Sequence, residues 1–206
     1  MRIISRESQF LSIIMSITRL MRAKEAARQA AKAPPVKEVA VFKTTEGELV
    51  AEFWPEVAPK TVENFKKLAK QGYFDGTAFH RIVKGSVIQG GDPLTKNSAN
   101  EEHYGEGGPG YMIKDEFSAS KHVRGVFSMA NLGRPNSAGS QFFVCLADAS
   151  YLDHKYAAFG KLIKGEDVLL KIGETPVGPN RRGEISKPKV RVGIESVKIV
   201  PADSIK

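Results

Sequence analysis

Short strand-like segments separated by glycine-containing turns occupy residues 39–200, and they constrain the fold more than any other feature of the chain. The first two, residues 39–45 and 48–54, flank Glu46-Gly47, a dipeptide typical of a hairpin turn. The later segments are FHRIV, SVIQ, GVFSMA, QFFVCL, AAFGKLI and KVRVGIESVKIV. This pattern favours a closed antiparallel barrel over a fold that alternates strands with helices.

Two stretches have the period of a helix rather than that of a strand. Pro59 suits the first turn of a helix, which we expect to run to about Lys70 and to stop at Gly72. A second, shorter helix is expected over residues 166–172. The fold class predicted from these patterns is therefore mainly β.

Positive charge is concentrated in the amino-terminal part of the chain. The 206 residues carry a formal net charge of +8. Residues 1–40 contribute +5 of it, from eight Lys or Arg and three Glu, which leaves +3 for the remainder. The remainder shows no basic stripe of the kind that nucleic-acid-binding domains carry, so we expect no nucleic-acid partner.

The first part of the chain also differs from the rest in composition. We expect residues 1–36 to form a basic extension, disordered or an amphipathic helix, ahead of a domain over 37–206. Its apolar run, residues 10–18, is far too short to span a bilayer. Ile13 and Ile17 recur at helical spacing, so a helix here could touch a membrane surface or a partner.

The sequence leaves open where the protein starts and where in the cell it acts. Met21 could be the true start of the protein, with a short solvated lead after it. Pro34-Pro35 would end any helix and form a linker. We expect a cytoplasmic monomer, and membrane association or export through residues 1–33 is the alternative.

We expect neither a metal ion nor a cofactor. Cys145 is the one cysteine, which excludes an internal disulfide and a cysteine-based zinc cluster, and its apolar surroundings predict a buried thiol. The glycine-rich loop 92–114 lacks the Gly-Lys-Ser or Gly-Lys-Thr ending of a phosphate-binding loop. The four histidines are not spaced as metal ligands are, and no carboxylate partners for them are evident. They are His80, His103, His122 and His154.

Three segments carry the functional signal: FHRIVKGSVIQGGD (79–92), SMANLGRPNSAGSQFFVCL (128–146) and YLDHKYAAFG (151–160). They offer an arginine, several amides and apolar side chains, but no pair of nucleophile and base. Together they resemble the core of the cyclophilins, which are peptidyl-prolyl cis-trans isomerases. The resemblance covers about residues 38–200. It implies an eight-stranded antiparallel β-barrel with a helix capping each end and a substrate groove outside the barrel.

An arginine without a proton-transfer partner suits this reaction. Amide resonance sets a barrier of roughly 20 kcal/mol to rotation about the X-Pro bond. At the transition state the proline nitrogen becomes pyramidal and gains a lone pair. A fixed cation or donor aimed at that nitrogen stabilises the transition state more than the planar ground state. A guanidinium fits, because it is permanently charged and forms several hydrogen bonds.

The resemblance also assigns roles to single residues. Arg81 falls on the family's catalytic arginine, Gln89 on the side chain that orients it, and Asn131 on the backbone N–H that meets the carbonyl before proline. Because Phe142 and Phe143 face opposite sides of a strand, only one of them, expected to be Phe143, can form the pocket floor. The residues expected to contact substrate are Val87, Ala130, Gln141, Phe143, Tyr151, Leu152 and Tyr156.

The chain departs from the family pattern around the pocket. Ser86 and Val87 stand where Phe and Met are common, Tyr151 where many members have Trp, and Tyr156 where His is usual. Loss of a phenyl group and a thioether should weaken burial of the substrate by roughly 2–3 kcal/mol. We therefore expect an isomerase of proline-containing polypeptides that assists folding, with an open pocket. The alternative is a proline-peptide binding or chaperone module with weak turnover.

Overall fold

The computed structural model describes residues 15–22, 24, 25 and 36–205. The chain divides into two units, residues 1–37 and 38–206, and each is considered by itself. No helix among the described residues is long and apolar enough to cross a membrane.

In the first unit, the described residues 15–22, 24 and 25 are helical. Ile17 lies in this helix, whereas Ile13 and the Pro34-Pro35 linker lie outside the described residues. The extension predicted over residues 1–36 therefore stays a prediction.

The second unit is built on one antiparallel sheet, which has nine strands over the described residues. Its hydrogen-bonded order is β3-β11-β1-β2-β8-β6-β7-β5-β4. The strands are β1 (Glu38–Thr44), β2 (Gly47–Phe53), β3 (Thr77–Phe79), β4 (Arg81–Val83), β5 (Val87–Gly90), β6 (Val126–Met129), β7 (Phe142–Cys145), β8 (Ala158–Lys164) and β11 (Val192–Pro201).

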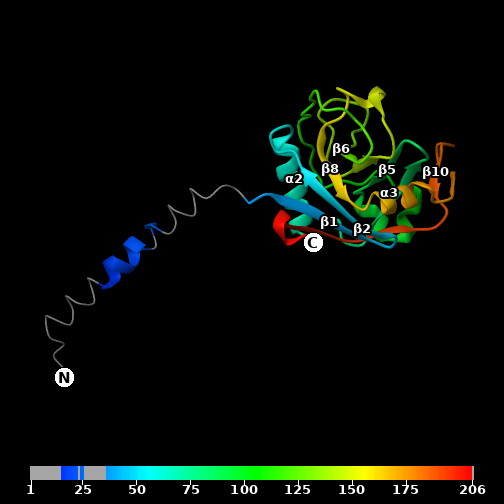
Figure 1. Cartoon of the computed structure of the whole chain (residues 1–206). Coiled ribbons are helices and arrows are strands. Elements are labelled where there is room, and N and C mark those ends of the chain that lie inside the picture. Colours follow the sequence, from blue (N-terminus) through cyan, green and yellow to red (C-terminus); the bar gives the residue numbers. More distant parts are fainter. Residues whose placement is uncertain (1–14, 23, 26–35, 206) are drawn as a thin grey trace, which may run out of the picture. The chain divides into compact units, whose positions relative to one another are not determined.

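The sheet curls into a nearly closed barrel (Figure 1). Its two end strands, β3 and β4, are separated in the chain only by His80. The His80 backbone N–H donates to the Gln89 carbonyl at 3.0 Å, so the ladder between this segment and β5 continues through the break. Counting residues 77–83 as one bent strand gives the eight strands that the resemblance implied, and the predicted fold class is confirmed.

Two helices cover opposite ends of the barrel, α2 (Pro59–Lys70) and α3 (Glu166–Gly173). From α2, the Phe65 ring lies 5.8 Å from the Phe53 ring at the end of β2. From α3, Val168 packs where β2 begins, at Gly47. Both helices lie where the sequence predicted them, and Gly72, with φ +68°, follows the end of α2 as expected.

The start of α2 has a cap from a distant loop. Its N-cap residue, Ala58, has no side chain that could accept a hydrogen bond. Instead, the Glu116 carboxylate accepts the backbone N–H groups of Lys60 at 3.1 Å and Thr61 at 2.8 Å. A negative charge at the amino end of a helix also interacts favourably with the helix dipole. Glu116 thus has a structural role.

Several elements have no counterpart in the sequence prediction. The loop 92–114 contains two short 3-10 helices, η1 (Pro93–Lys96) and η2 (Ser98–His103). A separate hairpin is formed by β9 (Val177–Pro179) and β10 (Ile185–Pro188), which pair with each other. Its prolines and glycines hide the strand pattern, because these residues usually mark loops.

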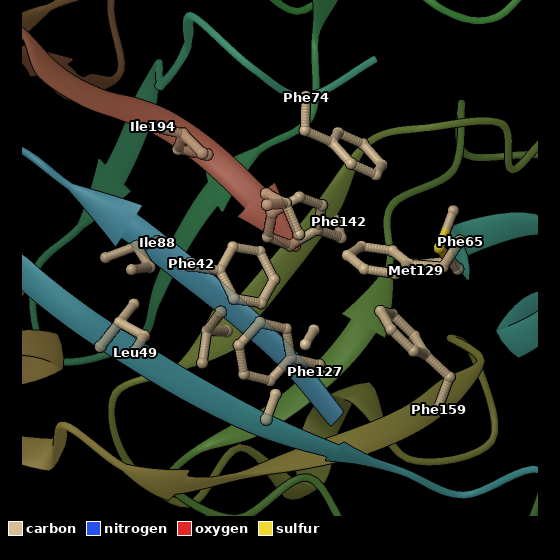
Figure 2. Packing of buried hydrophobic residues seen from close by; sticks show 14 of the residues in the cluster. Phe42, Leu49, Phe65, Phe74, Ile88, Phe127, Met129, Phe142, Phe159 and Ile194 are labelled. Atoms are coloured by element: carbon tan, nitrogen blue, oxygen red, sulfur yellow. The ribbon is translucent and has the colours of Figure 1, made fainter. Parts of the chain in front are cut away.

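The barrel interior is rich in phenylalanine, as Figure 2 shows. Phe142 of β7 lies at its centre, with its ring centroid 5.7 Å from that of Phe42 and 5.6 Å from that of Phe65. A second, smaller apolar cluster contains Phe143 and Cys145. Successive residues of β7 therefore face the interior and the outer surface in turn, as the strand period predicts.

We expect Phe142→Ala to lower the free energy of unfolding by about 3–5 kcal/mol, because the cavity left among these rings cannot fill. The measurement is equilibrium denaturation in urea. Phe117→Ala is the control, since Phe117 is 46% exposed and its removal should change stability little. Similar losses in both variants would contradict the central position of Phe142.

Candidate active site

A groove of about 970 Å³ lies on the outer face of the barrel. It is lined by apolar side chains of β5 and β7, by Arg81 of β4 and by the β9–β10 hairpin. The predicted site residues that line it are Arg81, Val87, Gln89, Ala130, Asn131, Phe143, Tyr151, Leu152 and Tyr156. Segments far apart in the sequence therefore meet at one surface.

Phe143 forms the floor of the apolar part of the groove. Its side chain is buried, and the Tyr156 ring stands edge-on to it, with centroids 5.3 Å apart and planes at 86°. Val87 and Leu152 pack in the same cluster. These side chains give this part of the groove an apolar lining of the kind that ligand pockets have.

Arg81 lies beside this pocket and is held by two side chains. Its Nη1 donates to Gln89 Oε1 at 3.3 Å, so Gln89 contacts the guanidinium directly. Its Nε and Nη2 donate to Glu184 Oε2 at 2.8 Å and Oε1 at 2.6 Å. The hydrogen bond to Glu184 is the main reason that the pKa of Arg81 is raised, so the guanidinium remains charged.

Sequence reasoning missed Glu184. The residue comes from the β9–β10 hairpin, for which no element was predicted, and 103 positions separate it from Arg81. The hydrogen bond from Arg81 is the largest cause that lowers the pKa of Glu184 to about 2. The available signal was the sequence Pro-Asn-Arg-Arg-Gly between Val177 and Ile185, which fits a hairpin turn.

Gln141 does not line the groove, although the resemblance made it a substrate contact. Its Oε1 accepts from Gln89 Nε2 at 2.9 Å. Its Nε2 donates to the carbonyls of Gly105 and Gly107, at 2.9 and 2.8 Å. In this structure its amide therefore links Gln89 to the loop 92–114.

Asn131 lines the groove. Its side chain is engaged locally, since Oδ1 accepts the Gly133 N–H at 3.0 Å and Nδ2 donates to the Lys155 carbonyl at 3.3 Å. No group among the described residues accepts the Asn131 backbone N–H. A peptide carbonyl lying in the groove would supply the missing acceptor.

Two of the departures from the family pattern contact each other. Ser86 Oγ and the Tyr151 hydroxyl form a hydrogen bond of 2.5 Å at the groove surface. Where the family commonly has two large apolar groups, this chain therefore has a polar pair. Tyr151 is 59% exposed, so the rim here is open to solvent.

Two of the histidines have carboxylate partners that the sequence analysis did not identify. His122 Nδ1 lies 3.0 Å from Asp153 Oδ1, and its Nε2 lies 3.1 Å from Ser128 Oγ. His103 similarly pairs with Glu106 at 3.1 Å. The expectation that histidines lack carboxylate partners is thus wrong. Folding brings Asp153 to His122 from 31 positions away, whereas Glu106 lies only three residues from His103 and was overlooked.

The Asp153–His122–Ser128 arrangement has the order of a hydrolase triad but not its accessibility. Ser128 is fully buried and His122 is buried, so no substrate can reach the hydroxyl. The His122 ring stacks on Phe143 at 6.0 Å, which places it beneath the pocket floor. The backbone N–H of His122 is the main cause of the lowered pKa of Asp153. This cluster supports the pocket.

The remaining reactive groups are also inert. Burial raises the pKa of Cys145 to about 12, so its thiol stays protonated. Burial lowers the pKa of His80 to about 4, so its ring stays neutral. Among the described residues, no group of three or more His, Cys, Asp or Glu could hold a metal ion.

Comparison with known proteins agrees with this geometry. Residues 39–199 match the family model described as cyclophilin type peptidyl-prolyl cis-trans isomerase. The chain is 42% identical over 153 residues to peptidyl-prolyl cis-trans isomerase-like 1 of Neurospora crassa, covering 72% of this chain and 90% of that protein. It is 39% identical over 161 residues to peptidyl-prolyl cis-trans isomerase CYP57 of Arabidopsis thaliana, covering 76% of this chain and 31% of that longer protein.

Among solved structures, the chain resembles a Cryptosporidium parvum cyclophilin-type isomerase crystallised in the presence of the dipeptide Ala-Pro. The TM-score is 0.69 at 33% sequence identity, and the match covers 79% of this chain and 98% of that one. The barrel, the external groove and these relatives agree: the chain belongs to the cyclophilin-type peptidyl-prolyl cis-trans isomerases.

Proposed function

We propose that this chain interconverts the cis and trans forms of X-Pro bonds in polypeptides, with Arg81 as the catalytic donor. In this proposal the proline ring enters the pocket over Phe143, and the carbonyl before proline accepts the Asn131 N–H. Arg81 then donates toward the proline nitrogen as that nitrogen becomes pyramidal. No covalent bond to the protein forms, and no proton is transferred.

The observation that carries the proposal is the position of Arg81 in the groove that Phe143 and Asn131 also line, with no acceptor for the Asn131 N–H among the described residues. An apolar pocket, a carbonyl-binding donor and a cation are what rotation about a prolyl amide requires. Gln89 holds one side of the guanidinium, which supports a fixed direction for the donor.

A second candidate function is a proline-peptide binding module with weak turnover. It is favoured by the Ser86–Tyr151 pair, which replaces apolar surface at the rim and should weaken burial of the proline ring. The two candidates differ in whether the groove accelerates exchange or only binds.

Exchange of a short X-Pro peptide, followed by NMR, separates these candidates. We expect the wild-type chain to accelerate cis-to-trans exchange and Arg81→Ala to lose most of that acceleration, about 100-fold or more, with an unchanged fold. Arg124→Ala is the control, because Arg124 lies outside the groove and contacts Glu166 and the Leu146 carbonyl. If wild type shifts the peptide resonances without accelerating exchange, the binding module is the correct function.

Restoring large apolar side chains at positions 86 and 87 tests whether the open rim of the pocket limits peptide binding. We expect Ser86→Phe combined with Val87→Met to lower the Kd for an X-Pro peptide by roughly tenfold, because about 2–3 kcal/mol of apolar burial outweighs one hydrogen bond of about 1 kcal/mol. Peptide titration followed by NMR measures this Kd. Val190→Phe, which adds apolar surface at a residue that is 65% exposed and outside the groove, should leave the Kd unchanged. No gain in the double variant would contradict a pocket limited by its rim.

We further propose that residues 1–36 are an extension dispensable for isomerisation and that the protein acts as a cytoplasmic monomer. Chains starting at Met1 and at Met21 should fractionate alike and accelerate exchange equally. Enrichment of only the longer chain in the membrane fraction would instead favour a tether within the first 20 residues.

A further inference from the structure

Glu184 is the closest partner of the Arg81 side chain. Both carboxylate oxygens are engaged, Oε2 with Nε at 2.8 Å and Oε1 with Nη2 at 2.6 Å. A bidentate pair of this kind fixes the plane of a guanidinium as well as its position. The single hydrogen bond from Nη1 to Gln89, at 3.3 Å, is longer.

The Glu184 carboxylate is itself held in place by the hairpin. Ser186 Oγ donates to Oε2 at 2.7 Å, and Asn180 Nδ2 donates to it at 3.2 Å. The Asn180 Oδ1 accepts the Glu184 backbone N–H at 3.1 Å, and Ser186 is buried. The Glu184 carboxylate is therefore oriented by contacts that do not involve Arg81.

The hairpin has anchors that do not involve Arg81. Arg181 pairs with Glu106 at 2.6 Å, and Lys187 pairs with Glu101 at 3.1 Å. Both partners lie in the loop 92–114, one of them in η2. Losing the Glu184 contact should thus leave the hairpin docked.

We propose that Glu184 is a positioning residue for isomerisation, which holds the Arg81 guanidinium in the orientation that serves the proline nitrogen. The inference rests on the proposed catalytic role of Arg81. The three hydrogen bonds of the guanidinium leave one N–H on Nη1 and one on Nη2 without an acceptor among the described residues. Both belong to the far end of a side chain that lines the groove.

The physical gain is pre-organisation. A free arginine side chain samples many rotamers, and that freedom is lost when it must meet one atom in the transition state. The pair with Glu184 removes this freedom before substrate binds. Both side chains are more than one third exposed, at 35% and 41%, so the ion pair should contribute little to stability. Its main consequence is then for rate.

Glu184→Gln tests the proposal. A glutamine amide presents one oxygen, while its NH₂ group faces the arginine donors, so the bidentate pair cannot form. We expect kcat for X-Pro exchange to fall about tenfold, with KM changed less than about twofold and Tm unchanged. Glu101→Gln is the matched control, because it removes the same charge and frees Lys187 of the same hairpin without contacting Arg81. Its kcat should equal that of the wild type.

Two further measurements separate positioning from a general structural effect. The NMR signal of the Arg81 Nε–H should be protected from solvent exchange in the wild type and in Glu101→Gln, and lose protection in Glu184→Gln. In an Arg81→Ala background, Glu184→Gln should cause no additional loss of residual activity, because it acts through Arg81.

The possible outcomes distinguish this inference from the function on which it rests. If Arg81→Ala retains full activity, the proposed catalytic role of Arg81 fails. If Arg81→Ala is inactive while Glu184→Gln is as fast as the wild type, or faster, the positioning role is overturned and that of Arg81 stands. A loss in Glu184→Gln that persists in the Arg81→Ala background would also overturn it.

Discussion

One row of paired residues across neighbouring strands places the centre of the candidate site. Arg81 of β4 pairs with Gln89 of β5, Gln89 with Phe143 of β7, and Phe143 with Ser128 of β6. Residues paired in this way lie on the same face of a sheet. The positions of Arg81, Gln89 and Phe143 are therefore set by strand register. A slip of one residue would turn them into the barrel and bring core residues outward.

This register is specified from the inside of the barrel. Phe142, adjacent to Phe143, packs its ring against Phe42, Phe65 and Phe127 of the interior. A slip of β7 by one residue would remove that ring from the core. Underneath the floor, His122 stacks on Phe143 and is bonded to Asp153 and Ser128. The pocket is thus supported by an aromatic core on one side and by a satisfied polar cluster on the other.

Local sequence patterns were sufficient to predict helices and the two faces of a strand, because these features depend on residues close together in the sequence. The period of residues 59–70, with Pro59 and Gly72 at its ends, predicted α2, and strand alternation separated Phe142 from Phe143. Side-chain pairs between distant segments could not be read in this way. The Arg81–Glu184, His122–Asp153 and Ser86–Tyr151 contacts each depend on how loops fold over the barrel, and no residue spacing encodes them. The β9–β10 hairpin was missed for a different reason, because its prolines and glycines are typical of loops.

Under the proposed mechanism, the polar rim and the ion-paired arginine affect different kinetic constants. Apolar surface around proline stabilises the bound ground state and the transition state almost equally, so reducing it raises KM and has little effect on kcat. A donor aimed at the proline nitrogen acts mainly in the transition state, because only there does the nitrogen carry a lone pair. Pairing with a carboxylate lowers the field of the guanidinium, but it keeps the remaining N–H groups in a fixed direction. A groove that binds proline weakly can therefore still catalyse isomerisation of the X-Pro bond, provided that the Arg81 N–H groups keep their direction.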